Sequence, residues 1–250
     1  MIPKIIHYCW FGRGKMPKLE KQCIQSWEKY LPDYEIKLWN EDNFDVNSIP
    51  YTKEAYEAKK YAFVSDYARF WILYHYGGIY FDTDVEIIKP IDDLLSKGAF
   101  FACEKNGGRL INSQWSITCA PGLGLAAYAD MEIYRTILDF YKTIRFLNND
   151  NSYNLTTVVS YTTKILKDYG LQNISEIQKI NNIWIYPSEY FCPIDYDTKK
   201  VNITENTYCI HYFAGSWISK RRKIKNKIID MLGERPTQLL IKMKKCFKLI

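Results

Sequence analysis

The sequence predicts one large α/β domain, and three observations carry that prediction. Its 250 residues, of which 47% are apolar, are enough to bury a sizeable core. Near the N-terminus an apolar β-rich run, a helical run and an alternating run follow one another, which is the pattern of a parallel strand–helix–strand unit. Further on, a strongly apolar helix ends at two glycines and leads directly into a short apolar strand.

The elements before residue 60 have the plainest signals. The first apolar run ends at Gly12-Arg13-Gly14, and the helix that follows is closed by Pro32. A run that alternates apolar and polar residues then predicts a second strand. In order, we expect a strand over residues 4–10, a helix over 18–30, a strand over 35–39 and a short helix over 52–60.

The next segment carries the strongest helical periodicity. Apolar residues recur every three or four positions over residues 63–76, and Asp66 and Arg69 lie three apart, so they project from one neighbouring face. Gly77-Gly78 then stops the helix, as glycine does at C-terminal caps. We expect strands over residues 79–81 and 85–88 on either side of Asp82-Thr83-Asp84.

Signals are weaker beyond residue 100. We expect strands over residues 100–103, 114–119, 183–186 and 207–212, and helices over residues 123–146 and 155–169. Residues 211–217 then close the α/β body. Because the sequence shows no internal repeat and no low-complexity linker, residues 1–219 are expected to form one domain.

The net charge of +6 is concentrated at the C-terminus. Eleven of the 34 Lys and Arg residues lie within residues 220–250, against Asp230 and Glu234, which leaves the rest of the chain mildly acidic. This tail predicts one or two basic amphipathic helices, broken at Gly233 and Pro236, that meet an anionic membrane surface. The alternative is a solvated basic end that keeps the protein soluble.

The seven cysteines show no C-x-x-C spacing, so neither a zinc site nor a disulfide framework is expected. Free thiols in a reducing cytosol are the simplest account. No signal segment precedes the first strand and no apolar run reaches membrane-spanning length. These features predict a cytoplasmic protein, attached peripherally to the inner face of the membrane if its tail binds lipid.

Asp82 and Asp84 form a D-x-D pair directly after an apolar strand. Paired carboxylates hold Mg²⁺ or Mn²⁺, which bridge phosphate oxygens and offset the charge on a leaving diphosphate. In an extended strand the two side chains share a face, about 7 Å apart, whereas in a turn they splay. A lone D-x-D is also common as an ordinary turn, so the surrounding residues decide between these interpretations.

The surrounding residues resemble glycosyltransferase family 32, the DXD-motif sugar transferases that include the fungal initiating mannosyltransferase and bacterial capsule and O-antigen transferases. The catalytic domains of the clostridial glucosylating toxins are more distant relatives. The resemblance is close over residues 2–95, thin over 100–205, and returns at 211–217. It implies a GT-A type nucleotide-sugar-binding fold with a Rossmann-like mixed sheet flanked by helices. The blocks that carry it are Ile2–Trp10, Ser65–Arg69 and Gly77–Asp84.

The resemblance implies donor-binding roles for several of these residues. Trp10 is similar to the aromatic that stacks on the donor base, and its alternative role is packing at a strand end. Asp66 and Arg69 are similar to the pair that contacts the sugar and diphosphate, and their alternative is an exposed ion pair of little energetic weight. Tyr80 belongs to the same donor-binding set.

The resemblance also implies how a cation is held. Asp84 is similar to the direct metal ligand, and Asp82 to the residue that contacts ribose or reaches the metal through water. His211 matches a position that supplies a further ligand, although a structural histidine explains it as well. Ser216 and Trp217 resemble a pair that closes over the diphosphate and excludes water.

The chain departs from the family on the acceptor side. Asn154-Leu155-Thr156-Thr157 stands where a Gly-Pro step is expected, and residues 112–114 match a polar stretch near the reacting sugar only loosely. His7 and His75 are interpreted as structural. The departure leaves the acceptor unidentified, and the sequence also leaves open the sugar, the linkage and the oligomeric state.

Together these features predict a metal-dependent hexosyltransferase, and the resemblance to family 32 implies that it retains the anomeric configuration. It would use Mn²⁺ or Mg²⁺ to move a sugar from a nucleotide sugar, with UDP favoured, to a glycan or lipid-linked acceptor in surface polysaccharide synthesis. A front-face route needs only metal, positioning and charge stabilisation, whereas double displacement needs a carboxylate beneath the anomeric carbon. The sequence nominates no such carboxylate.

Three alternatives remain. A sugar nucleotidyltransferase also uses paired Asp and Mg²⁺, but Gly12-Arg13-Gly14 is too sparse for its Gly-rich phosphate loop. A nucleic-acid-binding protein is disfavoured because the body is acidic and the basic tail lacks interleaved aromatics. A glycosyltransferase-like fold without activity is mildly disfavoured by the intact Asp82 and Asp84.

Overall fold

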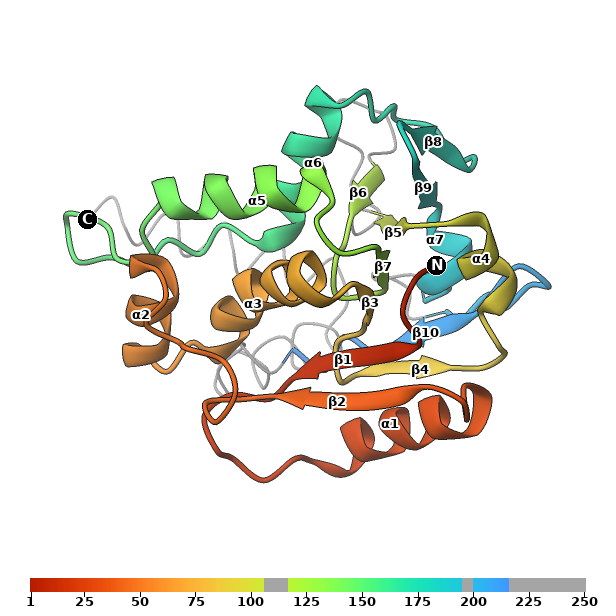
Figure 1. The fold of residues 1–250 in the computed structure, drawn as a ribbon, viewed down its shortest axis with the longest axis horizontal. Coiled ribbons are helices and arrows are strands. Elements are labelled where there is room, and N and C mark those ends of the chain that lie inside the picture. Colours follow the sequence, from red (N-terminus) through yellow and green to blue (C-terminus); the bar gives the residue numbers. More distant parts are fainter. Residues whose placement is uncertain (106–116, 195–199, 216–250) are drawn as a thin grey trace, which may run out of the picture. The chain divides into compact units, whose positions relative to one another are not determined.

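The computed structural model describes residues 1–105, 117–194 and 200–215 (Figure 1). The chain divides into two compact units, Met1–Phe213 and Ala214–Ile250, and the fold below is that of the first. The basic tail over residues 220–250 lies outside the described residues. Its separation from a domain over residues 1–219 therefore stays a prediction.

The described residues form a mixed eight-stranded sheet with the order β2-β1-β3-β7-β5-β9-β8, and β6 pairs with β5. β1 runs parallel to both β2 and β3, β7 is antiparallel to β3 and to β5, and β5 is parallel to β9. The strands are β1 (Ile5–Cys9), β2 (Glu35–Trp39), β3 (Gly78–Tyr80), β5 (Phe100–Lys105), β6 (Ile117–Cys119), β7 (Leu125–Ala127), β8 (Gln178–Ile180) and β9 (Ile183–Tyr186).

A second sheet has two antiparallel strands, β4 (Val85–Ile87) and β10 (Cys209–His211). Its register places His211 opposite Val85. The main-chain amide of Ile88 donates to the carbonyl of Tyr208 at 2.9 Å and continues the pairing. This small sheet therefore brings the last described strand beside the residues that follow β3.

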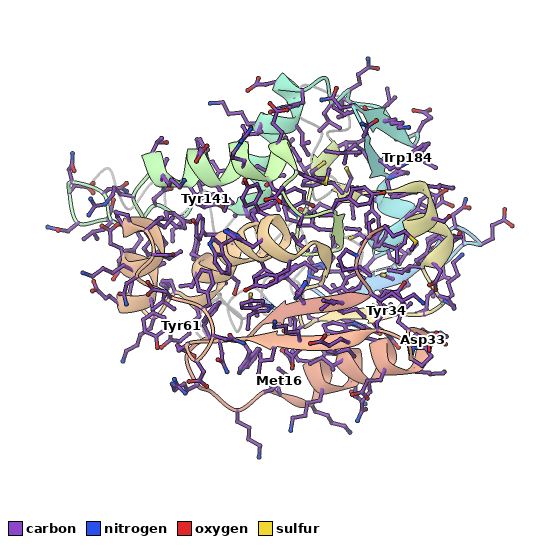
Figure 2. The ribbon with its side chains drawn as sticks, in the orientation of Figure 1. Met16, Asp33, Tyr34, Tyr61, Tyr141 and Trp184 are labelled. Carbon is purple, nitrogen blue, oxygen red and sulfur yellow. The ribbon has the colours of Figure 1, made fainter. Side chains whose placement is uncertain are left out.

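Helices cover the large sheet, and this mixed α/β architecture confirms the predicted fold class. In Figure 1, α3 and α5 run side by side, and α1 packs against β4. Tyr141 shows how the α3–α5 layer is filled, since its fully buried ring contacts Tyr51 and Tyr67 (Figure 2). The helices are α1 (Lys18–Tyr30), α2 (Pro50–Glu57), α3 (Tyr61–Tyr76), α4 (Asp92–Lys97), α5 (Glu132–Thr143), α6 (Val158–Asp168) and α7 (Ser188–Phe191).

The elements expected before residue 90 are confirmed with small changes at their ends. α1 and β2 have the expected bounds, whereas α2 begins earlier, at Pro50, because proline suits the first helical position. Gly77, with φ 63°, ends α3 as expected. Beyond this glycine the chain passes so close to β1 that a Cβ on Gly78 would lie 2.7 Å from the Ile5 carbonyl oxygen.

The predicted helix over residues 123–146 is wrong in its first half. Residues Leu125–Ala127 are all buried and form β7 in the middle of the sheet, so their apolar run reflects burial on both faces. Asp130, with φ 59°, then reverses the chain, and α5 begins only at Glu132. The sequence analysis also missed α4, β8 and α7, which are too short to show a periodic pattern.

The six described cysteines are free thiols, in agreement with the expectation of no disulfide framework. Cys103 and Cys119 face each other across β5 and β6 with their sulfur atoms 3.3 Å apart. The two predicted structural histidines bond to main-chain carbonyls, His7 to Gly77 and His75 to Trp71. No helix among the described residues has the length and apolarity needed to cross a membrane.

Candidate functional site

The D-x-D pair lies where the chain leaves β3. The amide of Phe81 donates to the carbonyl of His7 in β1, and the amide of Asp82 donates to the carbonyl of Gly122, at 2.9 Å. The chain then turns, because the amide of Val85 donates back to the carbonyl of Asp82 at 3.1 Å. The two aspartates therefore lie in a turn and not along an extended strand. This turn follows the carboxyl end of β3, and ligands bind at the carboxyl ends of the strands in this fold class.

Asp82 is held by two side chains through one of its oxygens. The hydroxyl of Tyr80 donates to Asp82 Oδ1 at 3.0 Å, and Nη2 of Arg69 lies 3.3 Å from the same atom. The guanidinium of Arg69 also lies over the Tyr80 ring, 5.0 Å from its centroid. These contacts fix the direction in which the Asp82 carboxylate points.

Arg69 and Asp66 form a buried pair on α3. Their Nη2 and Oδ1 atoms are 3.0 Å apart, and the two residues are 3% and 8% exposed. Burial raises the pKa of Asp66 to about 7, although the charge of Arg69 and the Val158 amide favour the ionised form. The alternative of an exposed ion pair is therefore wrong, and Arg69 balances carboxylates on two sides inside the protein.

Asp84 and His211 meet across the small sheet. His211 Nε2 lies 3.2 Å from Asp84 Oδ1, and the amide of Tyr212 donates to the Asp84 carbonyl at 3.0 Å. Burial lowers the pKa of His211, but Asp84 and the Cys192 thiol outweigh it and raise that pKa to about 10. Asp84 therefore attracts positive charge strongly at this position.

The two sides meet in one cluster of cation ligands. One ligand atom each from Asp82, Asp84 and His211 lies within 4.8 Å of the others. Two carboxylates and an imidazole are a donor set that suits Mn²⁺ or Mg²⁺. Gly122 also leaves room for the Asp82 carboxylate, because a side chain at residue 122 would occupy the place of that carboxylate. The residues present therefore fit the divalent cation that this kind of site implies.

Trp10 follows directly after β1 and is partly buried. Its indole N–H donates to the carbonyl of Gly14 at 2.7 Å. The preceding residue, Cys9, is buried, which raises its thiol pKa to about 12, and it interacts with Arg69 and Tyr80. Trp10 therefore follows, in the chain, a residue that interacts with Arg69 and Tyr80. Ser216, Trp217 and residues 112–114 lie outside the described residues, so their predicted roles are not tested.

Sequence reasoning missed three residues beside the cluster. Gly122 lies under Asp82, Cys192 lies beside the His211 ring, and His211 lowers the pKa of the mostly buried Glu104 against the stronger effect of burial. Cys192 follows the short α7, and Glu104 extends the face of β5 that begins with Phe100 and Ala102. Each contact is long-range, and the sequence holds one signal that could have indicated a turn at Gly122, the Pro-Gly pair before β7.

A comparison with known proteins finds relatives of the segment that carries the D-x-D pair. Residues 17–101 match the protein family described as a glycosyltransferase sugar-binding region containing a DXD motif. The matched segment contains Asp66, Arg69, Asp82 and Asp84. Trp10 and the strand that carries His211 lie outside it.

Individual relatives are similar over different lengths. The chain is 28% identical over 225 residues to the uncharacterized glycosyltransferase L373 of Acanthamoeba polyphaga mimivirus, which covers 87% of this chain and 84% of that protein. It is 32% identical over 115 residues to inositol phosphoceramide mannosyltransferase 1 of Schizosaccharomyces pombe, covering 40% of this chain and 33% of that protein. The chain thus spans about a third of this fungal relative.

Among solved structures, one similar chain is a glycosyltransferase involved in the glycosylation of the major capsid of PBCV-1. The sequence identity is 12% and the TM-score is 0.48, over 91% of this chain and 100% of that chain.

Proposed function

We propose that this chain transfers a sugar from a nucleotide-sugar donor with a divalent cation at Asp82, Asp84 and His211. The chain belongs to the glycosyltransferases that carry the DXD sugar-binding region, of the family 32 type. Its mixed sheet flanked by helices is of the GT-A type. The observation that carries the proposal is the convergence of these three ligand atoms within 4.8 Å. Asp82 and Asp84 follow the carboxyl end of β3, and α/β sheets bind nucleotides at the carboxyl ends of their strands.

The charges of the site support a divalent cation. Asp66, Asp82 and Asp84 bring three carboxylates, and Arg69 brings one permanent positive charge. Binding of a cation displaces the proton that Asp84 holds on His211, and with the three carboxylates ionised the site then carries two negative charges, which a divalent cation balances. When bound, such a cation supplies the positive charge that stabilises a departing diphosphate.

The remaining residues position the donor in this proposal. Arg69 is held rigidly between Asp66 and Asp82, so its guanidinium orients the Asp82 carboxylate and adds fixed positive potential. Trp10 offers an aromatic face for the base, and Tyr80 fixes Asp82. Retention of configuration by a front-face route is part of the proposal, because that route needs only this positioning and charge stabilisation.

The acceptor belongs to the proposal as a class. A relative named inositol phosphoceramide mannosyltransferase supports a lipid-linked or glycan acceptor, and transfer in surface polysaccharide synthesis fits the same chemistry. Residues 220–250 would bring the enzyme to such an acceptor if their Lys and Arg side chains bind anionic lipid at a cytoplasmic membrane face.

A donor panel tests this function. The protein and Mn²⁺ are incubated with UDP-glucose, UDP-galactose, their N-acetyl forms or GDP-mannose, and the release of nucleoside diphosphate is measured. We expect one donor to give free nucleoside diphosphate, with the rate lost in Asp84→Ala and kept in Asp139→Ala, whose carboxylate is exposed on α5. Release of pyrophosphate when a nucleoside triphosphate and a sugar 1-phosphate replace the nucleotide sugar would instead indicate a nucleotidyltransferase, and full activity in Asp84→Ala would refute the proposal.

A further inference from the structure

The sequence left the task of Asp82 less certain than that of Asp84, and the structure shows what holds Asp82 in place. We infer that Gly122 is a positioning residue of the cation site: its missing side chain is the space in which the Asp82 carboxylate lies. This inference rests on the proposed function for its consequence, but the contact itself is independent of any ligand.

The central observation is a close approach between a glycine and a carboxylate. A Cβ atom placed on Gly122 would lie 1.9 Å from Asp82 Oδ2 and 2.7 Å from its Cγ. Both distances are well inside van der Waals contact, so an alanine here and the observed Asp82 conformation exclude each other. Oδ1 of the same carboxylate contacts Tyr80 and Arg69, and in that orientation Oδ2 points to the place that a side chain at residue 122 would take.

The backbone conformation at residue 122 does not require a glycine. Gly122 does not have a positive φ, in contrast to Gly77, Gly78 and Gly98. At a position with ordinary φ, replacing glycine by alanine normally stabilises a protein, because alanine restricts the unfolded chain. The reason for a glycine at this position is therefore the neighbouring carboxylate.

The turn that carries Gly122 has little freedom to move away. Pro121 precedes it, and the amide of Leu123 donates to the carbonyl of Ala120 at 3.0 Å, which closes the turn. On either side, Ala120 and Gly124 bond to the main chain of Ala102 in β5, at 3.0 and 3.1 Å. The turn is therefore fixed to the middle of the sheet.

The Asp82 side chain is consequently the part that moves when a methyl group is added. Its main chain stays tied to Gly122 by the 2.9 Å hydrogen bond, whereas its carboxylate is a third exposed and free to rotate outward. Rotation would break the contacts with Tyr80 and Arg69 and move a ligand away from Asp84 and His211. One methyl group at Gly122 therefore removes Asp82 from the cation site without changing any charge.

The experiment combines Gly122→Ala with Asp82→Ala in a double-mutant cycle. In the wild-type background, Gly122→Ala should lower the melting temperature by about 3–8 °C, because two contacts to a charged group are lost. In the Asp82→Ala background it should lower it by less than about 2 °C, because no carboxylate remains to be displaced. Gly14→Ala is the matched control, since a Cβ there meets nothing within 4 Å.

Mn²⁺ binding, followed by electron paramagnetic resonance on the full chain, gives the second readout. Gly122→Ala should weaken the Mn²⁺ affinity about tenfold, the low end of the range for residues that orient metal ligands. It should have no further effect in Asp82→Ala, and Gly14→Ala should bind as the wild type does. Equal losses in both backgrounds, by either readout, would overturn the inference.

Two further outcomes are also decisive. If Gly122→Ala fails to fold, the double variant should recover the fold, and its failure to do so would refute the contact. If the wild-type chain binds no Mn²⁺, the proposed function fails, whereas the thermal cycle still decides whether Gly122 positions Asp82.

Discussion

The Asp82 side and the His211 side of the cation cluster are built differently. Asp82 lies against the large sheet, where its carboxylate contacts Arg69 and Tyr80 and points to the place that a side chain at residue 122 would take. His211 reaches the cluster from β10, in a two-stranded sheet, and faces Asp84 through one ion pair. One side is tied to α3 and to the large sheet, and the other is completed by a strand from the end of the described chain.

This difference teaches which property each side controls. On the Asp82 side, the contacts that orient the ligand also bury charge, so a change there disturbs folding and activity together. On the His211 side, the imidazole faces one carboxylate, that of Asp84, so a change acts more on cation affinity than on folding. The following predictions sharpen or break this division, beginning with the largest effect.

Asp84→Ala should give the largest loss of activity. It removes the carboxylate shared by the cation and His211, and we expect donor turnover to fall by about 10³-fold, the scale of a lost electrostatic stabiliser. Turnover with a saturating donor and Mn²⁺ measures this loss, and circular dichroism checks the fold. A loss of less than about tenfold, with the fold intact, would show that the cation is held elsewhere.

Arg69→Met should give the largest loss of stability. It leaves the buried carboxylate of Asp66 and the partly exposed carboxylate of Asp82 without their partner, so we expect the free energy of unfolding to fall by about 3–5 kcal/mol. Denaturant unfolding measures it. Arg145→Met is the matched control, because Arg145 pairs with Glu54 at the surface and its loss should cost about 1 kcal/mol or less. Equal losses in the two variants would break the proposed division.

His211→Ala should act more on the cation than on the fold. We expect Mn²⁺ affinity to fall about 10–100-fold, and the free energy of unfolding to fall less than in Arg69→Met, because the imidazole faces one carboxylate whereas Arg69 faces two. Calorimetric titration with Mn²⁺ and thermal melting separate the two effects. His75→Ala, at a surface histidine on α3, should change neither. A stability loss as large as that of Arg69→Met would contradict this account of the His211 side.

Cys192→Ala should have the smallest effect of the four. The thiol lies beside the His211 ring and helps to orient it, so Mn²⁺ affinity should fall by at most about tenfold. The same titration measures it. A larger loss than that of His211→Ala would mean that Cys192 itself contributes more to the cation site than the imidazole does.

The Asp82 side could largely be predicted from the sequence because its parts lie close together in the chain. The periodicity over residues 63–76 and the glycines after it place Asp66 and Arg69 on one helix and Asp82 just beyond the next strand. Burial of the Asp66–Arg69 pair could not be predicted, because α5 and α6, which pack in the same layer, follow far along the chain.

The His211 side was expected only through the resemblance to family 32. The pairing of β10 with β4 joins distant segments, and three-residue strands carry no periodic signal of their own. Gly122 shows the same limit, since its sequence context indicates a turn but not the carboxylate above it. The error over residues 123–146 has a related cause, because a strand buried on both faces has no alternation to distinguish it from a helix.

The most direct test of the central claim is anomalous diffraction at the manganese edge from crystals grown with Mn²⁺ and a nucleoside diphosphate. The account predicts a single strong peak in contact with the Asp84 carboxylate and the His211 imidazole, with Asp82 beside it, and its disappearance in Asp84→Ala crystals. A peak held by other residues of a chain that is active in the same buffer would contradict it.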